Sequence, residues 1–576
     1  MKKRILFLMV LCLFMAHKAL AYTWTDENGV TWTFSYLSFP INGESQKLWS
    51  ITDVVNFGEE VTIPEKIPIT SRTWDYGLQR YLEEGEEVTI EAIARNSTSY
   101  QVFGNPATGY IYTINLPSTI KFIGYNSLTA YGAVVNVNSE TPPVLGTADG
   151  TPTSFYNCTV RVPEQLLDTY HSAEGWEKSQ HTIISQSAKT DYDVTVSAQG
   201  GYSTLHYTIG EENLENVMTL KVTGSINGYD LMVIRNKMLN LHHLDLSDAS
   251  ILAADYKYYE DYKVTENNTT GKYAFAGINR LVSVKLPKTL KKVSQRAFMS
   301  CYGLKSVEFQ EGLEQVLDSA FYGCSRLRSV ALKQGLQSIH YSAFRSCDAL
   351  ETVDIVECDS IGSAAFYGSG TKTFIWHSGR ILGVSAFNSI DKYSSRLEKV
   401  VLPDNLKIIG KQAFYYCSKL SDITLPDGLE MLGAYWGSTK VNNKTVYKWM
   451  YFTNASPDSN GTFYECSSLK GITIPDGITF LGPYIFGYCA SLETVNLSKK
   501  LRSIATSAFS ECSSLTSISM PTGLQYINEY AFQNCSALPR IDLPSSIVSI
   551  GNYAFSGCTA LNGVYTYTVE PTDINQ

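Results

Sequence analysis

Apolar residues recur every 23 positions through the second half of the chain. One clean unit, from Cys512 to Asn534, reads CSSLTSISMPTGLQYINEYAFQN and fits the template C-x-x-L-x-x-[VI]-x-[LM]-P-x-x-L-x-x-I-x-x-x-A-F-x-x. Within it, Ile518 and Met520 alternate with polar residues, which is typical of a half-buried strand. Pro521 then ends the strand, because proline cannot donate to a ladder. This self-similarity predicts a solenoid, since one unit alone cannot bury its apolar face.

One phenylalanine position near the end of each unit counts the repeats. Stacking the units at a strand spacing of about 4.8 Å predicts a parallel sheet about 55–60 Å long. The position occurs twelve times, at Phe275, Phe298, Phe321, Phe344, Phe366, Phe387, Phe414, Phe463, Phe486, Phe509, Phe532 and Phe555.

These units resemble the leucine-rich repeats of the BspA-like family, the 23-residue class with an L-P…I-G…A-F…C signature, over about residues 240–565. The resemblance implies a mainly β solenoid: a right-handed leucine-rich repeat array with a parallel sheet and helical capping segments. It also implies a secreted or surface protein of a bacterium that binds host proteins or other cells.

Cysteine shares this periodicity. Neighbouring rungs would place these cysteines about 4.8 Å apart with parallel side chains, a geometry that disfavours the disulfide dihedral near 90°. We therefore expect mostly free, buried thiols. The sequence has no C-x-x-C pair and no paired histidines for a metal, and we expect no cofactor. The nine positions are Cys301, Cys324, Cys347, Cys417, Cys466, Cys489, Cys512, Cys535 and Cys558.

The N-terminus has the features of a secretory leader. A positive MKKR start precedes an apolar run of 12 residues from Ile5 to Ala16, and Ala19-Leu20-Ala21 follows. We predict a signal peptide over residues 1–21 and a secreted or extracellular protein, either released or associated with the outer surface. A membrane anchor is the alternative, although the run is too short to span a bilayer. No later stretch predicts a transmembrane segment.

Charge argues against nucleic acid as a partner. The chain has 46 Lys+Arg against 55 Asp+Glu, a formal charge of -9, and the leader holds four of the positive charges. The chain without its leader therefore stands at -13, whereas nucleic-acid binding needs a basic footprint.

Residues 22–187 predict a smaller, degenerate repeat block. The stretch from Tyr112 to Gly124 fits the repeat template from its strand to its I-G pair. The block closes with a strand, Thr159 to Pro163, and an amphipathic helix from about residue 164 to Trp176, which we interpret as a cap on a solenoid end.

The remaining segments are defined by their place relative to the array. Residues 188–250 predict its N-terminal cap, with a helical stretch from Tyr202 to Asn216. Residues 251–565 predict about twelve rungs with an insertion near 434–459. Residues 566–576 form a tail in which no second strand-helix cap is visible. An uncovered parallel edge invites pairing. Truncation of the sequence, a cover formed by residues 565–571 and an end-to-end dimer remain the alternatives.

Catalytic motifs are missing from the sequence. It contains no H-E-x-x-H, no G-x-S-x-G, no P-loop and no Rossmann glycine pattern. His242 and His243 are adjacent, and strand alternation would point them to opposite faces. The predicted strand surface is small, polar and mixed in charge, without a convergent acid, base and nucleophile. We therefore expect a binding protein, and no enzyme.

The insertion is the candidate binding site. A normal unit advances four positions from Gly410 to Phe414, whereas the step from Gly433 to Phe463 is thirty, an excess of 26 residues. Asn442-Asn443 could turn a hairpin there. Its aromatics could contact a protein or glycan, or could pack back on the solenoid. The six candidates are Tyr435, Trp436, Tyr447, Trp449, Tyr451 and Phe452.

These observations predict a leucine-rich repeat binding scaffold that adheres to a host or cell-surface macromolecule, either protein or glycan. The alternative is a glycan-capture protein that uses the aromatics of residues 434–459.

Overall fold

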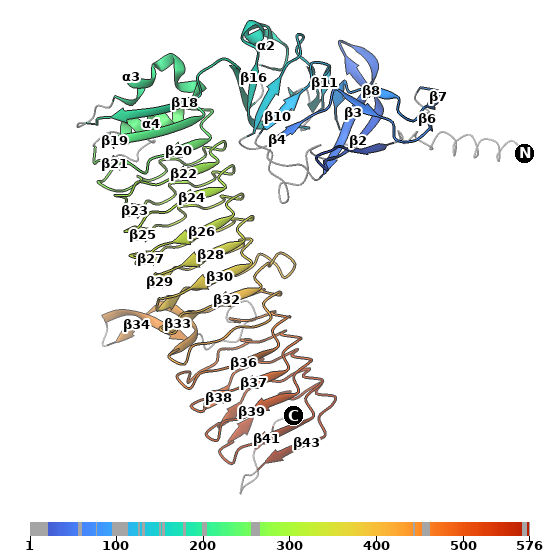
Figure 1. Cartoon of the computed structure of the whole chain (residues 1–576). Coiled ribbons are helices and arrows are strands. Elements are labelled where there is room, and N and C mark those ends of the chain that lie inside the picture. The colour runs from blue at the N-terminus through green and yellow to red at the C-terminus, as the bar shows by residue number, and fades with distance from the viewer. Residues whose placement is uncertain are drawn as a thin grey trace, which may run out of the picture. The chain divides into compact units, whose positions relative to one another are not determined.

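The chain forms two compact units, residues 1–190 (unit 1) and 191–576 (unit 2) (Figure 1). The predicted signal peptide, except Ala21, lies outside the residues that the structure describes. The computed structural model describes residues 21–55, 60–75, 78–94, 113–124, 127–128, 133–148, 151–152, 156–176, 180–198, 204–254, 265–441, 444–451, 461–566 and 573–574.

Unit 1 is a short solenoid with a long antiparallel hairpin at its start. Its first sheet runs in the order β1 (Tyr22–Thr25), β2 (Thr31–Ile41), β3 (Glu44–Val55), β9 (Ala92–Ile93), β11 (Phe122–Ile123) and β13 (Val144–Leu145). Its second is β17 (Gln180–Ser185), β16 (Tyr156–Val162), β12 (Val134–Val137), β10 (Thr113–Leu116) and β4 (Glu60–Thr62). Three two-stranded ribbons complete the unit: β5 (Lys66–Pro68) with β8 (Glu87–Thr89), β6 (Thr73–Asp75) with β7 (Arg80–Leu82), and β14 (Thr147–Ala148) with β15 (Thr151–Pro152).

The closing segment of unit 1 is longer than the sequence predicts. Strand β16 leads into a 3-10 turn, η1 (Glu164–Leu166), and the helix α2 (Leu167–Ser172). The Tyr170 hydroxyl donates to the Ser139 carbonyl at 2.7 Å, and the Trp176 indole donates to the Pro143 carbonyl at 2.9 Å. The chain then adds β17, which pairs parallel with β16. A strand, and not the helix, therefore forms the outer element of this sheet.

Unit 2 begins with a mixed cap. It comprises β18 (Asp191–Val196), α3 (Leu205–Ile209), the 3-10 helix η2 (Glu211–Asn216), β19 (Thr219–Ile226), α4 (Gly228–Lys237), β20 (His243–Asp245) and β21 (Ala249–Ile251). The helical stretch predicted over residues 202–216 is present from Leu205, and Gly210, with a φ of 88°, divides it into α3 and η2. Strand β18 pairs parallel with β19 and was not predicted.

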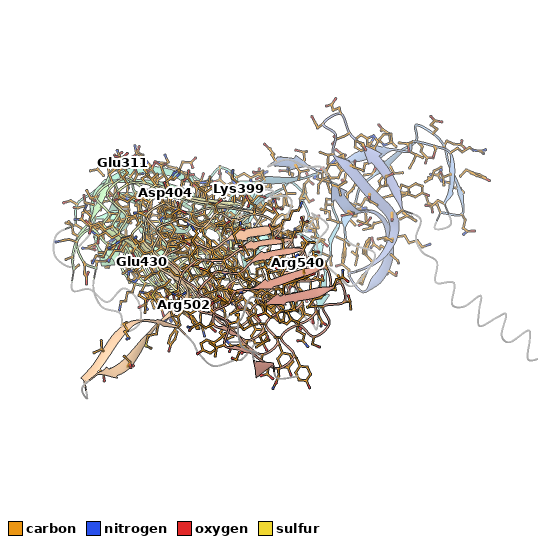
Figure 2. The ribbon with its side chains drawn as sticks, turned by 90° about the horizontal axis from the view of Figure 1, so that it is seen from below. Glu311, Lys399, Asp404, Glu430, Arg502 and Arg540 are labelled. Atoms are coloured by element: carbon orange, nitrogen blue, oxygen red, sulfur yellow. The ribbon has the colours of Figure 1, made fainter. Side chains whose placement is uncertain are left out.

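Stacked rungs follow, and most contribute one strand to each of two columns (Figure 1). Successive rungs pair parallel within a column, whereas β35 pairs antiparallel with β34. The first column continues with β22 (Ser283–Lys285), β24 (Ser306–Glu308), β26 (Ser329–Leu332), β28 (Thr352–Ile355), β30 (Thr373–Trp376), β32 (Lys399–Val401), β36 (Gly471–Thr473), β37 (Thr494–Asn496), β39 (Ser517–Ser519), β41 (Arg540–Leu543) and β43 (Gly563–Thr566). The second column holds β23 (Lys292–Val293), β25 (Gln315–Val316), β27 (Ser338–Ile339), β29 (Ser360–Ile361), β31 (Ile381–Leu382), β33 (Ile408–Gly410), β34 (Met431–Val441), β35 (Lys444–Tyr451), β38 (Ser503–Ile504), β40 (Tyr526–Ile527), β42 (Ser549–Ile550) and β44 (Asp573–Ile574). Seen along the stack, Glu311, Asp404, Glu430 and Arg502 lie at its periphery (Figure 2).

The twelve phenylalanines form one continuous column, as the period predicts. Each ring stacks on the ring of the next rung, with centroids 4.8–5.8 Å apart and planes within 13° of parallel. From Phe275 to Phe532 these side chains are buried. Offset stacking of this kind adds about 0.5–1.5 kcal/mol per pair beyond the burial of apolar area.

The nine repeat cysteines lie beside this column and share one contact. Each thiol donates a hydrogen bond to the main-chain oxygen of the phenylalanine of the preceding rung, with S···O distances of 3.0–3.3 Å. All eleven cysteines in the described part of the chain are free, and all but Cys558 are buried. Burial raises the pKa of Cys301 to about 12. Cysteine is therefore a small core residue here that also satisfies a buried carbonyl.

The helix α4 starts on a buried carboxyl group. Asp230 is fully buried, and its Oδ2 accepts a hydrogen bond from the Asn227 backbone N–H at 2.9 Å. The Asn227 side chain in turn accepts from the Tyr229 N–H at 2.9 Å, which completes a capping box. Burial raises the pKa of Asp230 to about 7, although backbone N–H groups near the carboxylate act in the opposite direction.

Thiol titration tests the cysteine column. In the native state we expect one fast-reacting thiol, Cys558, because it alone among the described cysteines is partly exposed and burial suppresses the thiolate of the others. Denaturation should release the rest, to eleven in a chain that starts at residue 22. Cys558→Ser should remove the fast phase. Two or more fast thiols in the native protein, or fewer than six after denaturation, would contradict the column.

The second prediction concerns Asp230. Between pH 4 and 7 the folded state retains a proton that the unfolded state has lost, so this group lowers the free energy of unfolding by up to about 1.4 kcal/mol per unit as pH rises. The decline should stop above pH 7. Asp230→Asn should remove it, whereas Asp193→Asn, at an exposed carboxylate, should not. Urea unfolding of the full chain from pH 4.5 to 8 measures the slope, and equal slopes in wild type and Asp230→Asn would refute the assignment.

Candidate functional site

A two-stranded ribbon, β34–β35, leaves the second strand column after the rung of Phe414. Met431 and Leu432 pair parallel with Ile408 and Ile409 as a normal rung does, and the register then shifts by one residue. The additional residue is Gly433, whose φ of 83° suits glycine, as in a β-bulge. Beyond this bulge the chain turns out of the ladder. Figures 1 and 2 both show the ribbon extending away from the stacked rungs.

The register of the ribbon sorts its aromatic positions onto two faces. Eight antiparallel pairs run from Ala434↔Tyr451 to Val441↔Lys444, and they include Trp436↔Trp449 and Ser438↔Tyr447. Directly paired residues share a face, and alternate residues along a strand share a face too. Positions 436, 447, 449 and 451 therefore lie on one face, which we call the aromatic face. Tyr435 and Met450 belong to the opposite face.

Tyr451 anchors the base of the ribbon to the array. Its ring lies 4.8 Å from the ring of Phe480, which belongs to the next rung. The side chain is half-buried, and burial raises the pKa of its hydroxyl. Of the two interpretations left open by the sequence, packing back on the solenoid applies to this residue.

The structure describes the other five candidate aromatics to different extents. Tyr435 and Trp449 are half-buried. For Trp436 and Tyr447 the backbone lies in β34 and β35, while their side chains are outside the described part of the chain. Phe452 lies outside it altogether, as do Asn442 and Asn443 of the predicted turn. The predicted hairpin itself is confirmed.

The positive charge of the ribbon was not among the predictions. Residues 431–451 contain Lys440, Lys444 and Lys448 and no acidic residue, in a chain whose formal charge is -9. A local positive field on an acidic protein favours an anionic partner. Lysines also protect open strand edges from pairing with other chains. This excess of lysine over acidic residues can be read from the sequence alone.

The described residues show no arrangement for metal chemistry. Within the described ranges, no group of three or more His, Cys, Asp or Glu side chains could hold a metal ion. His242 is buried and His243 is exposed, so the pair points to opposite faces as predicted. The described helices include none long and apolar enough to cross a bilayer.

The family model described as BspA type leucine rich repeat region matches six copies, over residues 268–394, 388–441 and 459–569. The repeat array of unit 2 belongs to this family. The BspA-type match includes β34 but leaves out residues 442–458, so the second strand of the ribbon is an addition to the family repeat. No curated protein matches the chain.

Solved structures similar to this chain include proteins of several bacteria. A leucine-rich repeat protein of Bacteroides ovatus ATCC 8483 is 25% identical, with a TM-score of 0.39, over 55% of this chain and 80% of that one. A leucine rich cell surface protein of Faecalibacterium prausnitzii A2-165 is 16% identical, with a TM-score of 0.24, over 95% of both chains. The pneumococcal vaccine antigen PcpA is 13% identical, with a TM-score of 0.25, over 89% of this chain and 95% of that one.

Substitution of Tyr451 tests its role as an anchor. We expect Tyr451→Ala to lower the free energy of unfolding by about 2 kcal/mol, because it removes a half-buried ring from Phe480. Val446→Ala is the matched control, since Val446 lies in the same strand and is exposed, and its effect should stay within about 0.5 kcal/mol. Urea unfolding followed by circular dichroism compares them. Equal effects would show that Tyr451 does not hold the ribbon.

Proposed function

We propose that this protein is a secreted or surface-displayed binding scaffold that adheres to a host or cell-surface macromolecule through the β34–β35 ribbon. The support is the continuity of the core beneath the insertion. Phe414 stacks on Phe463 at 5.3 Å with planes 7° apart, and the Cys466 thiol donates to the Phe414 carbonyl at 3.2 Å, as on regular rungs. The phenylalanine and cysteine columns therefore continue without the ribbon, which leaves its aromatic positions other than Tyr451 as candidates for contact.

The chemistry of the ribbon favours an amphipathic, anionic partner surface. Aromatic residues supply contact area with few rotatable bonds, and they are enriched among the residues that dominate binding energies. The three lysines of the ribbon would attract acidic groups and speed association. Export by the predicted leader would place this surface outside the cell.

Glycan capture is the second candidate function. It is favoured by the backbone pairing of Trp436 with Trp449, which puts two tryptophan positions opposite each other in the ribbon. Ring faces carry negative charge density, so they attract the polarised C–H groups of a sugar.

End-to-end pairing of two copies at the C-terminal edge of the array stays a separate prediction. Strand β43 pairs with β41 along one edge, and no strand pairs along its other edge within the described residues.

Arrays of extracellular host proteins and of glycans would test the function with the chain lacking residues 1–21. Replacing residues 435–450 by a short Gly-Asn turn should abolish binding, because it removes the ribbon and keeps the rungs. Trp436→Ala/Trp449→Ala should lower the affinity for a glycan at least about a hundredfold, and for a protein about tenfold. Tyr341→Ala, at an exposed tyrosine elsewhere on the array, is the control. No binding on either array, or undiminished binding by the shortened variant, would reject the proposal.

A further inference from the structure

Two neighbouring rungs of unit 2 depart from the usual length in opposite directions. The step from Phe366 to Phe387 is 21 residues and the next, to Phe414, is 27. The usual step is 23, the step that ends at Phe366 is 22, and the step that carries the ribbon is 49. In the short rung the turn at Gly370 lies so close to the rung before it that an added Cβ would meet the Asp348 carbonyl oxygen at 1.9 Å. The retracted turn and the long loop that follows it lie side by side.

The long loop, residues 388–396, is held by its own hydrogen bonds and by the rungs after it. Asp391 accepts from the backbone N–H groups of Tyr393 and Ser394 at 2.8 and 2.9 Å, and from the Ser394 hydroxyl at 2.9 Å. The Ser418 hydroxyl donates to the Lys392 carbonyl at 2.6 Å, and Lys392 lies 3.8 Å from Glu465. The loop is thereby fixed beside the retracted turn.

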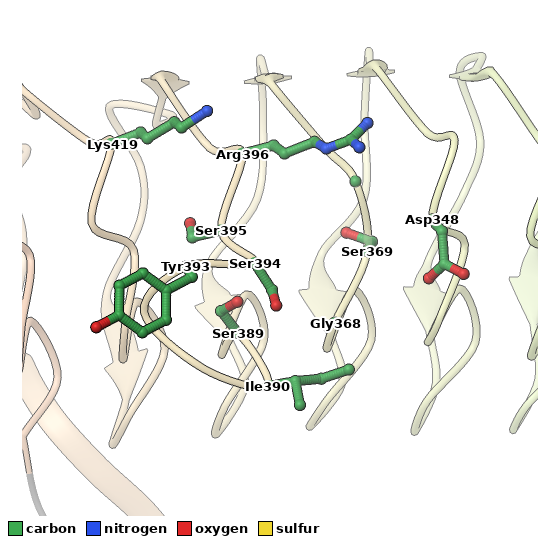
Figure 3. A pocket seen from close by; sticks show the side chains of 11 residues that line it. Asp348, Gly368, Ser369, Ser389, Ile390, Tyr393, Ser394, Ser395, Arg396 and Lys419 are labelled. Carbon is green, nitrogen blue, oxygen red and sulfur yellow. The ribbon is translucent and has the colours of Figure 1, made fainter. Parts of the chain in front are cut away.

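A cavity of about 500 Å³ opens between them, within the range of small-ligand sites. Figure 3 shows Arg396 and Lys419 along one side of it, and Ile390 and Tyr393 along the opposite side. Serine side chains occupy the space between the two sides, and Asp348 lies at one end. The serines are Ser369, Ser389, Ser394 and Ser395.

The charges in the cavity are separated. Arg396 and Lys419 supply two cations on one side, and Asp348 supplies a carboxylate at the end. Burial raises the pKa of Asp348, while Arg396 acts in the opposite direction, so the two groups lie within electrostatic range of each other. A simple anion attracted to the cations would also meet the Asp348 carboxylate. The cavity therefore favours a ligand that carries both a negative group and hydroxyl donors.

At the rim of the cavity an aromatic ring is exposed to solvent. Tyr393 is 85% exposed and Ile390 is 60% exposed, although both belong to the fixed loop. Exposed apolar side chains at the mouth of a polar cavity are typical of contact sites. The Lys392 ammonium lies 5.5 Å from the centre of the Tyr393 ring, which adds a third cation to this rim.

We propose that this cavity binds an acidic sugar residue, a hexuronic acid, with its carboxylate against Arg396 and Lys419 and its apolar ring face on Tyr393. The sugar hydroxyls then bond to the serines and donate to Asp348. A neutral sugar leaves the two cations unmatched, and a small inorganic anion leaves the serines and Tyr393 unused. The site is distinct from the β34–β35 ribbon and does not depend on the function proposed for it.

Calorimetric titration of the full chain tests the site with D-glucuronate and D-galacturonate. Glucose and galactose are the neutral analogues, and acetate and sulfate are the plain anions. We expect one uronate to bind at a single site at least about tenfold more tightly than its neutral analogue and than either anion, with affinity falling as salt rises. Absence of saturable binding by both uronates overturns the proposal, and equally tight sulfate shows a generic anion patch.

Single substitutions then assign the contacts. Arg396→Gln, Lys419→Gln and Tyr393→Ala should each lower uronate affinity about tenfold. Asp348→Asn should weaken uronate and strengthen acetate, because it removes the repulsion. Lys500→Gln and Tyr341→Ala, at exposed positions elsewhere on the array, are matched controls. Unchanged uronate affinity in the folded Lys419→Gln and Tyr393→Ala variants would overturn the assignment, and tighter binding of an acidic peptide would reassign the cavity to proteins.

Discussion

The spacing between rungs is the constraint on which the rest of unit 2 depends. Parallel backbone ladders set neighbouring strands about 4.8 Å apart, which is close to the separation at which aromatic rings stack with an offset. One phenylalanine per rung can therefore meet its neighbours through the array at 4.8–5.8 Å. Each ring is covered by the rungs on either side, so stability arises between neighbours, as in other repeat arrays.

The period made this core predictable, because a 23-residue repeat converts position in the sequence directly into position in a column. The twelve phenylalanines and the free thiols followed from it. The acceptor of each thiol did not, since the Phe275 carbonyl that meets Cys301 is set by how two turns nest in space. The break at Gly210 and the strand β17 were also missed, because both depend on local backbone geometry that the repeat template does not contain.

The residues of the candidate site could be predicted from the sequence, whereas their arrangement on the two faces of the ribbon could not. An insertion rich in aromatics with an Asn-Asn turn predicts a hairpin, but a shift of one residue would exchange its two faces. The two-residue connection between Val441 and Lys444 sets that register and places Trp436 opposite Trp449, whereas the bulge at Gly433 interrupts the pairing with β33. The cavity beside residues 388–396 was not predicted, for a related reason. The short and long steps between phenylalanines on either side of it are visible in the sequence. That the retracted turn lies next to the long loop becomes clear only when the rungs are stacked.

Irregularity in unit 2 is concentrated where the core can tolerate it. The widest step of the phenylalanine column, 5.8 Å between Phe387 and Phe414, lies beneath the long loop, and the step beneath the ribbon is 5.3 Å. Both remain within 7° of parallel, so insertions of 4 and 26 residues leave the stacking intact. A solenoid confines such additions to the outside of single rungs. The two candidate binding surfaces therefore arise in adjacent rungs, because loop length can vary there without breaking the column that holds the array together.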